Sequence, residues 1–379
     1  METHEKSATK QIVHTPPQGL AVRSAALVVR GLRDLTRDSN WLIKKVFTGQ
    51  SSHMAISPSG QVCTLSPQVR YGSQRVVLYD IELSAAMMAL SVPGETGTFQ
   101  PGSVDEEAAA FAWSPTARYL VAAWGAWHPQ LHLFDVHGKM LLGAFGVFDR
   151  IPQNLAWSET GKYFAAASSG GKGATLRVWQ ATRQEMPLSK SPVAEIGAPQ
   201  GIEPQTYGEG FEEEGAFRGY GKSGFSPNEN MLASVASIQG EWADDSILIA
   251  ESHSLQNQSL FQAQGHITDL TWTPDSRQIV YCAAGQAYRL AAGSPDFEPL
   301  PFGAELCVCH PHLPLCVCFS SWLKNSAKGR MFLVDLNRMT VFDEYAAEGV
   351  VDLRWSLDGS KAFAMTQSGM AYIYEPALL

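Results

Sequence analysis

The sequence lacks long apolar runs, and it lacks the motifs of the common enzyme classes. No stretch approaches the roughly 18–20 apolar residues of a membrane-spanning helix, so we expect no transmembrane segment. The first 18 residues are polar, so we expect no secretory signal and a cytoplasmic protein whose six cysteines are free thiols. No Gly-x-Ser-x-Gly elbow, His-Glu-x-x-His pair or Rossmann glycine pattern occurs, which excludes the enzymes that those motifs define.

Basic residues are also in short supply. The chain has 28 Lys and Arg against 37 Asp and Glu, for a net charge of −9. Residues 1–40 carry a small positive balance, so the remainder is more acidic than the whole. An acidic body repels phosphate backbones, and we therefore expect no nucleic-acid partner.

What the sequence does contain is an internal repeat. Residues 266–290, HITDLTWTPDSRQIVYCAAGQAYRL, match residues 350–374, VVDLRWSLDGSKAFAMTQSGMAYIY, in an apolar strand ending in Trp, a tight turn and two further strands. Further copies, some weaker, place the turns at positions 58, 115, 159, 227, 274, 311 and 357. A period of about 40–45 residues is typical of the four-stranded blades of a propeller. The two wide spacings contain insertions, at 93–107 and 197–218.

Degenerate forms of a Trp-Asp pair end the third strands of several repeats. They are Tyr79-Asp80, Phe134-Asp135, Trp179-Gln180, Val334-Asp335 and Tyr374-Glu375, and one repeat opens with Gly265-His266. With these pairs, residues 41–376 resemble the WD-repeat propeller family. The resemblance implies an all-β, seven-bladed β-propeller of four-stranded blades. The last repeat supplies only three strands, so we expect Trp41–Thr48 to complete its blade and close the ring.

The propeller is expected to span residues 41–379, and the chain ahead of it divides into two parts. Residues 1–18 contain two prolines and no periodicity, which indicates a mobile tail. Residues 19–40 are expected to form an amphipathic helix and linker, with helical periodicity over 20–37. Leu27 and Leu32 lie with other apolar side chains on one half of this helix, and Arg30 and Arg33 lie on the other half.

Three placements of this helix are open. It packs on its own propeller, docks on a partner protein, or lies on an anionic membrane surface. The absence of Trp and Phe from residues 20–37 disfavours contact with a membrane surface.

A cysteine-rich segment, CVCHPHLPLCVC at 307–318, has the residue types of a zinc site. However, one residue separates the paired cysteines, whereas zinc sites usually have two to four. Alignment with the other repeats places Cys307, Cys309, Cys316 and Cys318 at core-facing positions of paired strands, where a free cysteine behaves as a small apolar residue. We therefore expect buried thiols, no metal and no cofactor.

Aromatic side chains mark the loops between the second and third strands of several blades. In the resembled family these loops share one face with the loops that join the blades. Tryptophan is frequent at binding hot spots, although each of these residues could instead pack over its own blade. The candidate partner-binding residues are Trp124, Trp127, His128, Trp242 and Trp322 in these loops, Tyr207, Phe211 and Arg218 in the acidic insertion, and Leu27, Leu32, Arg30 and Arg33 in the helix.

These features favour a non-catalytic protein–protein interaction subunit, a scaffold within a larger assembly whose partners are other protein subunits. The alternative is a propeller-type enzyme, such as a hydrolase or lactonase, with its site at the central channel. Such an enzyme requires His, Asp, Glu or Asn side chains that converge from several blades. Asp269 and Asp352 occupy equivalent places in two blades, but the other repeats have no carboxylate there.

Overall fold

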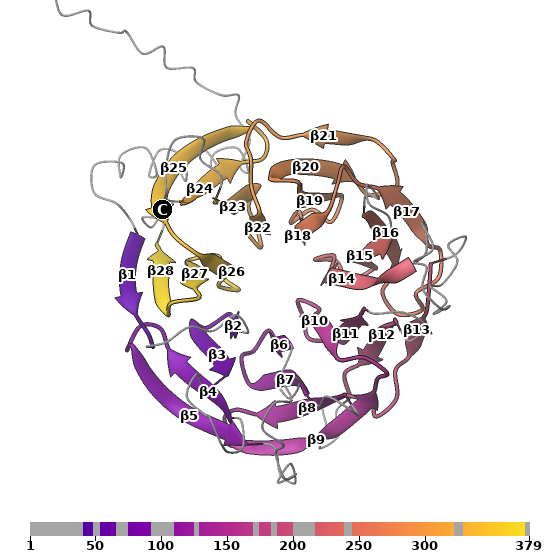
Figure 1. Ribbon diagram of the computed structural model, residues 1–379, viewed down its shortest axis with the longest axis vertical. Helices are drawn as coiled ribbons and strands as arrows, with labels where there is room; N and C mark the ends of the chain where they lie inside the picture. Colours follow the sequence, from indigo (N-terminus) through magenta and orange to yellow (C-terminus); the bar gives the residue numbers. More distant parts are fainter. Residues whose placement is uncertain are drawn as a thin grey trace, which may run out of the picture.

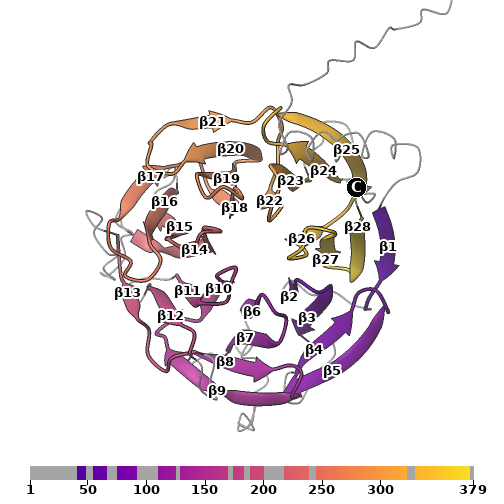
Figure 2. The same cartoon turned by 180° about the vertical axis from the view of Figure 1, so that it is seen from behind.

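The computed structural model describes residues 41–47, 54–65, 75–91, 110–124, 129–169, 174–182, 188–199, 217–238, 245–321 and 329–375. These residues form seven antiparallel four-stranded sheets, arranged as blades around a central axis (Figures 1 and 2). The all-β, seven-bladed fold expected from the sequence is confirmed. Within the described part of the chain, no helix is long and apolar enough to span a membrane.

The blades are numbered in chain order, and each runs from an innermost to an outermost strand. Blade 1 holds β2 (Met54–Ile56), β3 (Gln61–Leu65), β4 (Arg75–Asp80) and β5 (Ala85–Ser91); blade 2 holds β6 (Ala110–Trp113), β7 (Tyr119–Trp124), β8 (Gln130–Asp135) and β9 (Met140–Val147). Blade 3 holds β10 (Pro152–Trp157), β11 (Tyr163–Ser168), β12 (Leu176–Gln180) and β13 (Ala194–Ile196); blade 4 holds β14 (Phe217–Phe225), β15 (Met231–Ile238), β16 (Ser246–Glu251) and β17 (Ser259–Gln262). Blade 5 holds β18 (Ile267–Trp272), β19 (Gln278–Ala283), β20 (Gln286–Ala291) and β21 (Phe297–Pro299); blade 6 holds β22 (Leu306–Cys309), β23 (Leu315–Ser320), β24 (Gly329–Asp335) and β25 (Thr340–Ala347).

Blade 7 combines strands from distant parts of the sequence. Its inner strands are β26 (Val350–Trp355), β27 (Ala362–Thr366) and β28 (Met370–Tyr374), and its outermost strand is β1 (Trp41–Lys45). Strand β1 pairs antiparallel with β28, with Trp41 opposite Tyr374. The ring of Trp41 also lies 6.1 Å from that of Tyr345 in β25, so the strand contacts blade 6 as well.

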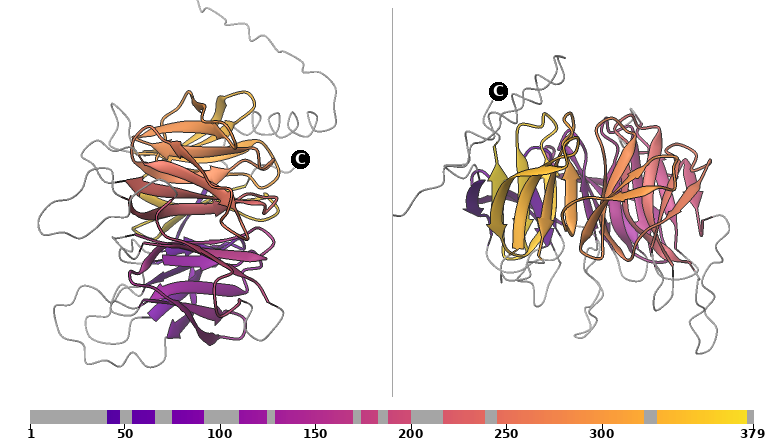
Figure 3. Two further views of the ribbon diagram at one scale, coloured as in Figure 1. Left: turned by 90° about the vertical axis from the view of Figure 1, so that its right-hand side faces the viewer. Right: turned by 90° about the horizontal axis from the view of Figure 1, so that it is seen from above.

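The core consists of apolar layers, one between each pair of neighbouring blades. The middle strands are apolar on both faces because a blade covers each face. In β7, Leu120 and Ala122 pack in the layer toward blade 1, whereas Val121 and Ala123 pack in the layer toward blade 3. Seen from the side, the strands cross the thickness of the disc, so these layers fill the disc from one face to the other (Figure 3).

In six of the seven blades, a buried hydroxyl organises the turn after the innermost strand. In blade 2, Ser114 Oγ accepts the N–H of Tyr119 at 3.0 Å, which closes the loop into β7. The same bond is made by Ser57 to Gln61, Ser158 to Tyr163, Ser226 to Met231, Thr273 to Gln278 and Ser356 to Lys361. Blade 6 has His310 at this position. The repeated turn seen in the sequence is therefore a hydrogen-bonded structural unit.

The tryptophan that precedes this turn ties neighbouring blades together. Trp272 Nε1 donates to the carbonyl of Gly224 in blade 4 at 2.9 Å. Trp113 and Trp355 donate in the same way to Ala55 and Val308, each in the preceding blade. Among the described residues, this indole bond is made in blades 2, 5 and 7, so the Trp-turn phrase of the sequence marks a contact between blades there.

Candidate functional site

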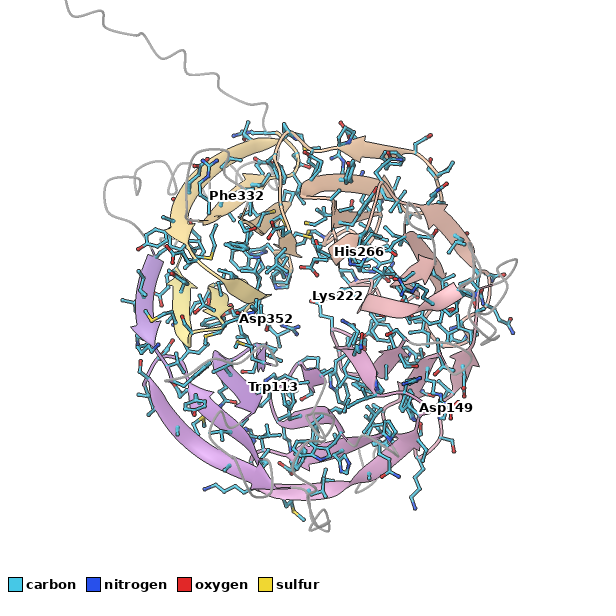
Figure 4. The ribbon with its side chains drawn as sticks, viewed as in Figure 1. Trp113, Asp149, Lys222, His266, Phe332 and Asp352 are labelled. Carbon is cyan, nitrogen blue, oxygen red and sulfur yellow. The ribbon has the colours of Figure 1, made fainter. Side chains whose placement is uncertain are left out.

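The innermost strands enclose a central channel with a cavity of about 420 Å³. Strands from all seven blades contribute to its wall, and the side chains of Lys222 and Asp352 lie beside it (Figure 4). Two acids, Asp269 and Asp352, and two bases, Lys222 and Arg354, line this cavity. The channel is therefore polar and close to neutral overall.

In each of three innermost strands, a β-bulge directs one polar side chain toward the next blade. The pairing register shifts immediately before Asn154, Asp269 and Asp352, each three residues ahead of the turn tryptophan. Each side chain then accepts a backbone N–H of the following blade at 2.9 Å, from Ser223, Cys307 and Ile56 respectively. These polar groups therefore join consecutive innermost strands.

Lys222 adds an ion pair to the link made by Asp269. Its Nζ lies 3.1 Å from Asp269 Oδ1, and the side chain is 42% exposed because it borders the open channel. The Asp269 carboxylate raises the pKa of Lys222, and the charge of Asp352 adds to this effect, although burial opposes it. Lys222 is therefore a stably charged ammonium that neutralises the channel acids.

Asp352 and Arg354 lie on the same strand two residues apart. Burial raises the pKa of Asp352, while the charge of Lys222 opposes that rise. Burial also lowers the pKa of Arg354, with Asp352 acting in the opposite direction. Arg354 is the one long side chain at its level of the channel, since the equivalent residues of the other blades are Ala55, Ala112, Ala156, Gly224, Thr271 and Val308.

A smaller cavity of about 190 Å³ lies at the turn end of the channel and includes Arg354 and His310. His310 Nδ1 accepts the N–H groups of His312 and Leu313 at 2.9 and 3.0 Å, so the proton of the neutral ring is on Nε2. Nε2 then donates to the carbonyl of Gly359 in blade 7 at 3.2 Å. Burial lowers the pKa of His310 to about 4, so His310 is a neutral structural group near pH 7.

Five free thiols are buried together between blades 5 and 6: Cys282, Cys307, Cys309, Cys316 and Cys318. In blade 6 they form two directly opposed pairs, Cys307 with Cys318 and Cys309 with Cys316. Hydrogen bonds from Cys282 and Cys316 lower the pKa of Cys307 to about 6. Burial raises the pKa of Cys316 and Cys318. The core position expected for the four blade 6 cysteines is confirmed.

Only two of the candidate partner-binding residues lie in the described part of the chain. Arg218 is the second residue of β14 and is exposed. Trp124 was expected on an exposed loop, but it ends β7 and is only 3% exposed, in the layer between blades 1 and 2. That expectation was wrong because the strand extends through the tryptophan. Outside the described residues lie Trp127, His128, Trp242, Trp322, Tyr207, Phe211, Leu27, Leu32, Arg30 and Arg33.

The channel residues Lys222, Asn154 and Arg354 were not among the sequence-based candidates. A signal for two of them exists, because Asn154 and Lys222 align with Asp269 when the repeats are superimposed on the turn. No metal-site geometry involving three or more His, Cys, Asp or Glu is found among the described residues. Both channel carboxylates accept backbone N–H groups, so their geometry serves to join blades.

No protein-family model and no curated protein matches the sequence. Solved structures do match. A chain of hydrazine synthase from Kuenenia stuttgartiensis aligns with a TM-score of 0.61 and 14% identity, over 89% of this chain and 98% of its own length. A chain from the crystal structure of the mitotic checkpoint complex aligns with a TM-score of 0.58 and 12% identity, over 89% and 95%. At these identities the similarity shows the propeller fold alone.

Proposed function

We propose that the protein is a WD-repeat-type propeller that acts as a non-catalytic protein–protein interaction subunit of a larger cytoplasmic assembly. The observation that carries this proposal is the bonding of the channel. Asp269 and Asp352 each accept a backbone N–H of the next blade, and Lys222 pairs with Asp269. The polar groups best placed for catalysis thus serve the rigidity of the ring, and a rigid ring is suited to hold loops for binding.

The partner-binding surface is assigned to one face of the disc. Loops between second and third strands lie at the same end of each sheet as the connections between blades, because consecutive strands are antiparallel. Trp127, Trp242 and Trp322 fall in three such loops of the sequence. Arg218, the last residue of the acidic insertion, is exposed at the start of β14, at this same end of the blade. This face is opposite to the Ser/Thr turns.

Structural similarity does not distinguish this role from catalysis. One similar chain belongs to hydrazine synthase and the other to the mitotic checkpoint complex, and both share only the fold with this chain. The hydrogen bonds that the channel acids make to backbone N–H groups support the proposal of an interaction subunit over the alternative, a hydrolase or lactonase.

Affinity purification from the native host tests the proposal. The full chain should retain partner proteins in fixed stoichiometry, and the triple variant Trp127→Ala, Trp242→Ala and Trp322→Ala should lose them while melting normally. Leu357→Ala is the matched control, because Leu357 is exposed on the turn face. Metal analysis of the same sample tests the alternative, because a stoichiometric ion with no retained protein would favour the enzyme.

A further inference from the structure

The outermost strands of blades 1 and 2 carry no charged residue. Their sequences are AAMMALS in β5 and MLLGAFGV in β9. Strand β17 also lacks charge but has the polar residues Ser259 and Gln262. The other four outer strands have charged side chains: Lys44 and Lys45 in β1, Glu195 in β13, Glu298 in β21, and Asp343 and Glu344 in β25. Proteins usually protect a long edge strand with charge, with proline or with a covering segment.

Large apolar side chains are exposed along these two strands. Met87 in β5 is 42% exposed, Met140 and Val147 at the ends of β9 are 53% and 59% exposed, and Leu83 in the turn before β5 is 75% exposed. Single exposed apolar residues are common on any protein. Here, however, they lie on adjoining strands without an intervening charge, which is the pattern of a surface that another segment covers.

This surface is continuous across three blades. Met88 of β5 and Leu141 of β9 pack against the same apolar layer between blades 1 and 2. On the other side, Lys44 of β1 donates to the carbonyl of Glu82, in the turn before β5. We call this surface the apolar rim; it comprises the exposed residues Leu42, Ile43, Leu83, Met87, Met140 and Val147. The strands β1, β5 and β9 that carry it lie at the left and lower edge of Figure 1.

We propose that residues 20–37 of this chain cover the apolar rim. Three residues separate this segment from Trp41, the first residue of β1, so it is tethered beside the rim by a linker of about 10 Å. Trp41 pairs with the last residue of β28 and Ala85 with the last residue of β4, so β1 and β5 begin at the same end of the disc. The tether therefore starts where β5 starts.

The dimensions and the charges of the two surfaces agree. Eighteen residues of helix are about 27 Å long, and the seven residues of β5 extend about 23 Å. One helix laid along β5 therefore covers the strand. Strands β5 and β9 offer no acid to pair with Arg30 or Arg33, and Glu82, beside Leu83, is already paired with Lys361. The half of the helix that contains Leu27 and Leu32 therefore faces the rim, and the arginines face outward. A basic stripe is then presented to an acidic partner.

Site-specific photo-crosslinking in the full chain tests this placement. Leu27 is replaced with benzoylphenylalanine, the protein is irradiated at low concentration, and crosslinked peptides are mapped by mass spectrometry. We expect crosslinks within one chain to residues of β1, β5 or β9. Crosslinks to another region of the same chain, to a second copy or to a different protein would overturn the proposal, as would no crosslink at all.

Amide hydrogen exchange provides a second measurement on the full chain. The double variant Leu27→Glu and Leu32→Glu should raise the exchange rates of residues 85–91 and 140–147 by about tenfold or more, because uncovered edge amides exchange readily. The matched variant Arg30→Glu and Arg33→Glu should leave these rates unchanged. Neither double variant should change the exchange rates of residues 259–262 in β17. Equal rates in wild type and in the leucine variant would contradict the inference.

Discussion

Asp269 Oδ1 lies 3.1 Å from Nζ of Lys222, while Oδ2 of the same carboxylate accepts the backbone N–H of Cys307 at 2.9 Å. Lys222 belongs to blade 4, Asp269 to blade 5 and Cys307 to blade 6. A single carboxylate thus connects the innermost strands of three consecutive blades. The ammonium offsets the cost of keeping this carboxylate charged where it is 4% exposed.

Removing the ammonium should therefore destabilise the ring. We expect Lys222→Met to lower the free energy of unfolding by about 1–3 kcal/mol at pH 7, measured by urea denaturation. The effect should be smaller than that for a fully buried pair because Lys222 borders the open channel. Since Asp269 raises the pKa of Lys222, this contribution should persist up to about pH 10.5 and decline above it, as the ammonium deprotonates.

A double-mutant cycle isolates the pair. In an Asp269→Asn background, which keeps a side-chain oxygen for the Cys307 N–H, Lys222→Met should have little effect. An equal loss of stability in both backgrounds would show that Lys222 contributes through packing rather than through its charge.

The indole bonds between blades give a second prediction. Trp272→Phe removes the donor to Gly224, and the carbonyl that remains unpaired should cost about 1–3 kcal/mol of unfolding free energy beyond the lost ring area. Trp157 is the matched control, because its Nε1 is buried without a hydrogen-bond partner in the described part of the chain. Trp157→Phe should cost less, and an equal cost in the two variants would argue against a role for the hydrogen bond.

The architecture could be predicted from the sequence because several blades repeat the same contacts. The turn hydroxyl of Ser114 and the indole of Trp272 act locally, within a hairpin or between adjacent strands, so their residue types recur at a fixed offset. The buried cysteines of blade 6 were predicted by the same alignment. A pattern that reflects a repeated contact can be extended to a copy as degenerate as blade 6.

The channel was not accessible in the same way, because its side chains depend on irregularities of pairing. The register shifts between Tyr220 and Ser223, which determines how Lys222 faces its neighbours. No periodic pattern predicts such a bulge. The loop position predicted for Trp124 was wrong for a related reason. The sequence pattern does not determine the residue at which a strand ends, and one further residue of β7 moves this side chain from a loop into the core.

The thiols give a third prediction. Iodoacetamide should label Cys307 before Cys316 and Cys318, and only as the blades open locally, since hydrogen bonds lower the pKa of Cys307 while all three thiols are at most 3% exposed in the core. The raised pKa values of Cys316 and Cys318 should protect these thiols until unfolding. Mass spectrometry of a labelling time course measures the order, and simultaneous labelling of all three would contradict it. A chelator should leave the melting temperature unchanged.

The last prediction concerns stability between pH 4 and 6.5. His310 is held neutral in the folded ring, with a pKa of about 4, whereas an unfolded histidine titrates near 6.5. Between these values the unfolded chain binds a proton that the folded chain does not, so stability falls as the pH falls and levels off below pH 4. This difference in pKa corresponds to about 3 kcal/mol of unfolding free energy. Most of this loss should appear when urea denaturation at pH 7 is compared with urea denaturation at pH 4.5.

His310→Ser is the matched variant, because serine occupies this turn position in most other blades and supplies an acceptor for the turn N–H groups. The variant loses the packing of the imidazole on Trp355, whose ring lies 4.7 Å away, so its stability at pH 7 should fall. Its stability should nevertheless depend less on pH between 6.5 and 4 than that of the wild type, because the group that takes up the proton on unfolding is gone. If both proteins lose the same free energy over this range, the neutral His310 is not the source of the acid sensitivity.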